Sequence, residues 1–93
     1  MENNAIAYNK TTQHYKGVPV TLIVYTEKHF AKLRAKRYML GDPKYNQNIW
    51  IPNSCLLPDG TIRPDANLDW IFLRAHRERK FMYARIDIDP RTW

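Results

Sequence analysis

Residues 18–25 read VPVTLIVY, a run made mostly of β-branched and aromatic residues. A run of β-branched and aromatic residues bounded by polar ones is typical of a β-strand. Alternate side chains of a strand point to opposite faces of its sheet. The two predicted faces therefore carry Val20, Leu22 and Val24 on one side, and Thr21, Ile23 and Tyr25 on the other.

The segment that follows, residues 27–40, has features of an amphipathic helix. Thr26 is a suitable N-cap residue, and Gly41 with Pro43 would end the helix. Lysines recur every four residues, so they would form one exposed basic stripe along it. This predicted stripe consists of Lys28, Lys32 and Lys36.

Four further patterns complete the predicted order of elements. Residues 48–51 (NIWI) predict a short second strand, and the turn signal LPDGT at 57–61 predicts a small hairpin. Residues 68–80 have helical spacing, with Asn67 as the candidate N-cap. Residues 81–88 (FMYARIDI) alternate cleanly and predict a last strand.

The predicted order is therefore βαββαβ, counting the hairpin as one short strand. This order indicates a small α+β two-layer sandwich of the ferredoxin-like kind, with a mostly antiparallel sheet and two helices on one face. A chain of 93 residues is long enough for one such domain. We assign residues 17–93 to it and expect residues 1–16 to be a loose N-terminal segment or an extra edge strand.

The composition narrows the class of function. The chain has 15 Lys plus Arg against 9 Asp plus Glu, and its net charge of +6 favours polyanionic partners. The single cysteine, Cys55, cannot form an internal disulfide, and no signal peptide or apolar spanning run is visible, so we expect a cytoplasmic protein without membrane contact. The sequence has no P-loop, dinucleotide fingerprint or zinc spacing, so we expect no cofactor, no metal and no enzymatic activity.

If both helices cover one face of the sheet, the opposite face is open. An open sheet with aromatic rings and an arginine is how RNA-recognition modules stack unpaired bases. A second subunit or a chain terminus could cover this apolar face instead, which leaves a homodimer open. The predicted open face carries Ile23, Tyr25, Trp50, Phe81, Tyr83 and Arg85.

The second predicted helix adds a candidate contact surface. Trp70, Arg74 and Arg77 fall on the side away from its apolar stripe. Exposed arginines can contact phosphates without regard to base sequence, and the lysine stripe could do the same. An exposed tryptophan beside two arginines is also the composition of a protein-binding hot spot. Alternatively, these residues form an ordinary solvated helix face that contacts neither nucleic acid nor protein.

Three functions follow from these patterns. The first is a non-enzymatic module that binds RNA or DNA, or a complex that handles nucleic acid. The second is an accessory protein of a phage or mobile element, such as an anti-CRISPR, that inhibits a host defence complex by binding a protein or ribonucleoprotein. The third is a metal-dependent nuclease or small hydrolase that uses Asp87 or Asp89.

Overall fold

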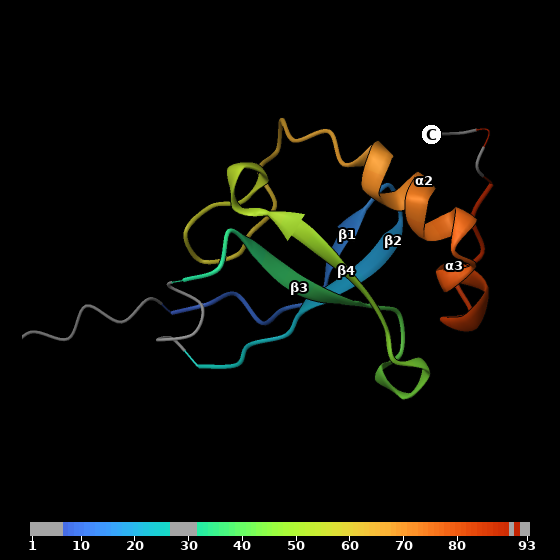
Figure 1. The fold of residues 1–93 in the computed structure, drawn as a ribbon, viewed down its shortest axis with the longest axis horizontal. Coiled ribbons are helices and arrows are strands. Elements are labelled where there is room, and N and C mark those ends of the chain that lie inside the picture. Colours follow the sequence, from blue (N-terminus) through green and yellow to red (C-terminus); the bar gives the residue numbers. More distant parts are fainter. Residues whose placement is uncertain (1–6, 27–31, 90, 92–93) are drawn as a thin grey trace, which may run out of the picture.

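The computed structural model describes residues 7–26, 32–89 and 91. They form a four-stranded antiparallel sheet, with two short helices that lie together at one side of it (Figure 1). The elements are β1 (Gln13–Tyr15), β2 (Val18–Leu22), β3 (Ala35–Leu40), β4 (Gln47–Pro52), α2 (Asp69–Arg77) and α3 (Lys80–Tyr83).

Each strand pairs with its neighbour along the chain, in the order β1-β2-β3-β4. A two-residue turn joins β1 to β2, with positive φ at Lys16 (48°) and Gly17 (83°), as the twist of a tight hairpin requires. The 3₁₀ turn η1 (Pro43–Tyr45) joins β3 to β4. The α+β class is therefore confirmed. The ferredoxin-like order is not, because no α-helix separates the strands in the described residues.

Several predicted elements are confirmed in place. The strand β2 covers the first five residues of the predicted strand 18–25, and β4 encloses the predicted strand 48–51. A bridge between Leu56 and Ile62 forms the predicted small hairpin. The helix α2 lies within the predicted helix 68–80. Its N-cap position is Leu68 and not the predicted Asn67, although the Asn67 side chain accepts the N–H of Asp69 at 3.0 Å at the start of the helix.

The predicted helix over residues 27–40 is wrong in its last part, which forms β3; residues 27–31 lie outside the described residues. Burial along β3 alternates with the two-residue period of a strand, so that every second side chain faces the core. Lys36 is one of these and is only 7% exposed. Its aliphatic stem packs inward while its Nζ donates to Asn53 Oδ1 at 2.9 Å. An exposed lysine stripe that includes Lys36 is therefore also wrong.

The predicted last strand over residues 81–88 is wrong as well. Residues Lys80–Tyr83 form the single-turn helix α3, and Arg85 after it has a positive φ of 55°. The Ile86 N–H donates to the Phe81 carbonyl at 2.9 Å, so the chain turns here instead of extending. Phe81 is buried in the core, which corrects its predicted place on the open face.

The core lies between the sheet and the layer made by α2, α3 and the segment before them. Its largest fully buried side chains include Tyr38 and Phe72. Tyr38 donates its hydroxyl hydrogen to the Gly60 carbonyl, and burial raises the pKa of this phenol. The other buried apolar side chains are Val18, Val20, Leu22, Leu40, Ile49, Ile51, Leu56, Leu68, Ile71, Ala75, Phe81 and Ala84.

A polar cluster joins the β1–β2 hairpin to the start of α2. The Tyr15 hydroxyl donates to Asp69 Oδ1 at 2.6 Å and accepts from the Leu68 N–H at 2.8 Å. Lys16 Nζ lies 2.9 Å from Asp69 Oδ2. The hydrogen bond from Lys16, followed by that from Tyr15, lowers the pKa of the Asp69 carboxyl. Folding therefore favours the ionised form of Asp69.

We expect Asp69→Asn to lower the free energy of unfolding at pH 7, and the deficit to shrink as the pH falls below about 4. A carboxyl with a depressed folded pKa stabilises the fold above its unfolded pKa. That contribution is lost as the pH falls through the folded pKa. Urea unfolding of both proteins between neutral and acid pH measures the deficit, with the exposed Asp65→Asn as control. A deficit that does not change with pH would contradict the role of this charge.

Candidate binding groove

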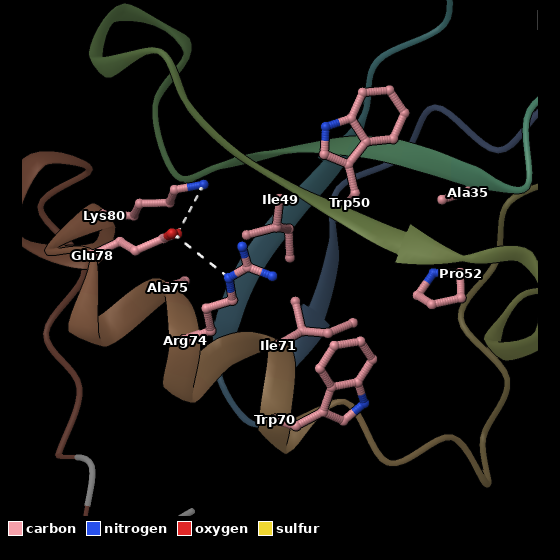
Figure 2. Close-up of a pocket in the computed structure, with 10 residues that line it drawn as sticks. All are labelled: Ala35, Ile49, Trp50, Pro52, Trp70, Ile71, Arg74, Ala75, Glu78 and Lys80. Carbon is pink, nitrogen blue, oxygen red and sulfur yellow. Dashed lines mark ion pairs between the residues drawn. The ribbon is translucent and has the colours of Figure 1, made fainter.

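A groove of about 340 Å³ follows the outer edge of β4, where α2 passes close to the sheet (Figure 2). β4 is the last strand of the sheet, so no strand of the described residues covers this edge. We call the face of the sheet that packs on α2 the inner face, and the opposite face the outer face. The groove has walls on both faces and so passes around the edge. We call it the β4 groove and define it by Trp50, Trp70, Ile71, Arg74, Ala75 and Lys80.

Two tryptophans stand on opposite sides of β4 (Figure 2). Trp50 is 48% exposed on the outer face, because its neighbours Ile49 and Ile51 point into the core. Trp70 is 56% exposed on α2, while Ile71 is directed inward. An indole has a large apolar area and one N–H donor, which makes it suited to contacts with a partner molecule.

The α2 side of the groove is apolar at its base and charged at its rim. Ile71 and Ala75 are buried there. Arg74 Nε and Lys80 Nζ lie 3.7 Å and 3.5 Å from the Glu78 carboxylate. Two cations against one carboxylate leave this rim positive. Figure 2 shows both ion pairs converging on Glu78.

The outer face beside Trp50 holds a fixed guanidinium. Arg37 donates from Nε and Nη2 to Asn48 Oδ1 at 2.8 Å and 2.6 Å, and from Nη1 to the Tyr25 hydroxyl at 2.7 Å. Arg37 lies directly opposite Trp50 in the β3–β4 ladder. Tyr25, Arg37 and Trp50 therefore share the outer face. The helical interpretation of residues 27–40 missed Arg37, because the inward-facing Lys36 hides the two-residue period of β3 in the sequence.

The structure brings three of the predicted binding residues together in the β4 groove: Trp50, Trp70 and Arg74. The predicted aromatic platform is only partly formed, since Tyr25 shares the outer face with Trp50 but Tyr83 is exposed on α3. Glu78 and Lys80, which also line the groove, were not among the predicted residues.

The remaining predicted residues are dispersed. The guanidinium carbon of Arg85 lies 5.7 Å from the centre of the Tyr45 ring, away from the sheet. Lys32 is exposed before β3, Lys36 is in the core, and Lys28 lies outside the described residues.

A second hollow of about 710 Å³ lies beside α3 and is lined in part by His76, Arg77 and Arg79. Its other wall includes Asp87, which follows α3 in a segment without regular structure. Asp89 is paired with Arg91 at 3.1 Å, which lowers the pKa of its carboxyl. Residues 84–89 form no strand, so Asp87 and Asp89 are not held together on one strand face.

The described residues contain no group of three or more His, Cys, Asp or Glu side chains arranged to hold a metal ion. Over the same residues, no helix has the length and apolar character needed to cross a membrane. Comparison of the chain with protein-family models, curated proteins and solved structures finds no match.

Proposed function

We propose that the protein is a non-enzymatic binding module that holds a protein partner in the β4 groove. The observation that carries this proposal is the meeting of Trp50, Trp70 and Arg74 at one groove. Tryptophan and arginine are enriched among the few residues that dominate the energy of protein interfaces. Covering two half-exposed indoles would remove a large apolar area from water, which favours association.

The charge of the chain indicates the kind of partner. A net charge of +6 favours an acidic protein surface, or a complex that handles nucleic acid. An accessory or inhibitor protein of the anti-CRISPR kind, acting by binding and not by chemistry, is consistent with this charge and with the small size of the domain. We propose this class as the more specific form of the function.

We expect Trp50→Ala and Trp70→Ala each to weaken partner binding about thirtyfold, which corresponds to roughly 2 kcal/mol. Each substitution removes one wall of the groove, and neither indole belongs to the buried core. Tyr83→Ala is the matched control, because Tyr83 is 55% exposed and lies on α3 outside the groove. We expect this control to bind like the unaltered protein.

Affinity capture on the immobilised protein, compared with capture on the Trp50→Ala/Trp70→Ala double variant, selects partners that need the groove. Calorimetric titration of each purified partner then gives its affinity for every variant. Circular dichroism spectra show whether the variants remain folded. A partner held equally well by the double variant and the unaltered protein would contradict the proposal.

Nucleic-acid binding is the second candidate, and one observation favours it. Arg74, Arg77 and Arg79 are all exposed on α2 and the turn after it. Fluorescence anisotropy with labelled single-stranded and duplex RNA and DNA, at low and physiological salt, tests this surface. Binding that falls steeply with salt and weakens in Arg77→Ala would support phosphate contacts. Tight nucleic-acid binding that is lost in Trp50→Ala and Trp70→Ala would assign the groove to nucleic acid instead of protein.

A further inference from the structure

The outer edge of β4 presents backbone groups as well as side chains. The Asn53 N–H donates to the Arg34 carbonyl at 2.9 Å, and the Ile23 N–H donates to the Arg37 carbonyl at 2.9 Å. Arg37 therefore turns its backbone groups toward β2, and the even-numbered residues of β3 turn theirs toward β4. In an antiparallel ladder this makes Trp50, opposite Arg37, a non-hydrogen-bonded pair. The N–H and C=O of Trp50 then point to the free edge.

Both backbone groups of Trp50 lack a hydrogen-bond partner among the described residues. The edge has a defined limit on each side of them. On one side, Lys80 Nζ donates a hydrogen bond to the Asn48 carbonyl oxygen at 2.7 Å. On the other side, Pro52 has no N–H to donate. The open part of the edge is thus short and centred on the tryptophan that forms one wall of the β4 groove.

We propose that the partner contributes an extended peptide segment, which pairs with β4 as a fifth strand and places an acidic side chain beside Arg74 and Lys80. This inference rests on the proposed function and specifies its partner. Addition of a strand to an exposed sheet edge is a common mode of peptide recognition: backbone hydrogen bonds supply affinity, and pockets for alternate side chains supply specificity.

The two faces of the groove match the two faces of such a strand. Side chains of an added strand alternate, so every second one would contact Trp50 on the outer face. The intervening ones would point to Trp70 and Ile71 on the inner face. At about 3.3 Å per residue, the edge from Asn48 to Pro52 accepts roughly five residues.

The charge at the rim selects among extended peptides. Arg74 and Lys80 both pair with the one carboxylate of Glu78, which leaves one positive charge unbalanced. An Asp or Glu of the bound peptide would neutralise that charge. A second copy of this chain fits the groove less well, because the inner-face side chains of its own β4, Ile49 and Ile51, are already buried in its core. The occupant we infer is therefore an acidic, extended segment of another protein.

The test uses two pools of synthetic peptides, each about seven residues long with polar ends. The first pool has a central Glu flanked by Val, Ile, Thr, Phe or Tyr, and the second has Lys in place of Glu. We expect the best Glu peptide to bind about tenfold more tightly than its Lys counterpart. Equal affinity of the two would overturn the charge assignment, and absence of binding from both pools would overturn the inference.

N-methylation of the best peptide, one residue at a time, tests pairing with the strand directly. Only every second backbone N–H of an added strand faces β4, so we expect affinity to fall about tenfold at alternate positions and to stay unchanged between them. The unaffected positions are the matched controls. Losses without this alternation would overturn strand addition.

Nuclear magnetic resonance on the unaltered protein gives a second readout. We expect bound peptide to shift the Trp50 backbone amide and the Trp70 indole N–H, and to slow hydrogen exchange of the Trp50 amide. Slow exchange that depends on protein concentration without peptide would assign the edge to a second copy. If a partner protein needs both tryptophans but leaves the Trp50 amide unprotected, strand addition is wrong while the proposed function stands. If neither tryptophan matters, both are wrong.

Discussion

Phe72→Ala is expected to remove about 3 to 5 kcal/mol from the free energy of unfolding. Phe72 is fully buried and stacks between two other rings, with centroid distances of 4.9 Å to Tyr15 and 6.1 Å to Phe81. These rings come from β1, α2 and α3, so truncation of Phe72 removes ring contacts that hold α2 to both β1 and α3. The loss combines the transfer free energy of the phenyl ring with the cost of the cavity that it leaves.

Urea unfolding followed by circular dichroism measures this loss. A domain of this size has a total stability of roughly 5 to 14 kcal/mol, so Phe72→Ala is expected to lose a large fraction of it. Phe72→Leu, which keeps most of the apolar volume, provides a milder variant if the alanine variant does not fold. The exposed Tyr83→Ala should change stability by no more than about 0.5 kcal/mol. A loss below about 1 kcal/mol in Phe72→Ala would contradict a tightly packed ring cluster.

Gly41→Ala is expected to cost about 2 to 5 kcal/mol, from two sources. Gly41 has a φ of 62°, a left-handed conformation that is unfavourable for a residue with a Cβ atom. A Cβ atom built at this position would lie 2.8 Å from the backbone oxygen of Ala84. Since that oxygen belongs to the chain just after α3, the contact cannot be relieved by rotating a side chain.

Gly17→Ala is the matched control for this prediction. Gly17 also has a positive φ, 83°, but a Cβ atom there would meet no atom within 4 Å. Its expected cost is only the conformational part, about 1 to 2 kcal/mol. Thermal or urea unfolding measures the loss of stability in both variants. The loss in Gly17→Ala gives the cost of backbone strain, and the extra loss in Gly41→Ala gives the cost of the close contact between the β3–β4 turn and the chain after α3. Equal losses in the two variants would contradict that approach.

Where local pattern and tertiary environment agree, the sequence predicted the structure well. The β-branched run in β2 and the apolar run in β4 form strands, and their inward and outward faces are as predicted. The apolar stripe of α2 faces the core. These elements carry both tryptophans of the groove, so spacing alone places Trp50, Trp70 and Arg74 on exposed faces as candidate binding residues.

The helix predicted over residues 35–40 is wrong because Lys36 is buried, unlike most lysines. A lysine is usually exposed, so a lysine at every fourth residue indicates an exposed helix face. Here the packing of β3 between two strands overrides that preference. Burial lowers the pKa of the Lys36 ammonium, and Asn53 supplies the hydrogen-bond partner that makes its position tolerable.

The strand predicted over residues 81–88 is wrong for a different reason. Their alternation satisfies a strand pattern, but the buried ring of Phe81 packs against Phe72 as part of a helical turn. Arg79 and Arg85 have positive φ values of 61° and 55°, which local propensity does not indicate. The placement of Trp50 and Trp70 on the two sides of one groove depends on how α2 crosses β4, and no pattern in the sequence specifies that crossing.

The Lys80–Asn48 hydrogen bond and the proline at position 52 also bear on the behaviour of the protein in concentrated solution. An unguarded strand edge acts as a template on which copies of the same chain can stack into filaments. Here a cation covers one carbonyl of the edge and a proline removes a donor at the other end. These two features shorten the part of the edge that is open for pairing, so we expect Lys80 to oppose edge-to-edge stacking of copies of this chain.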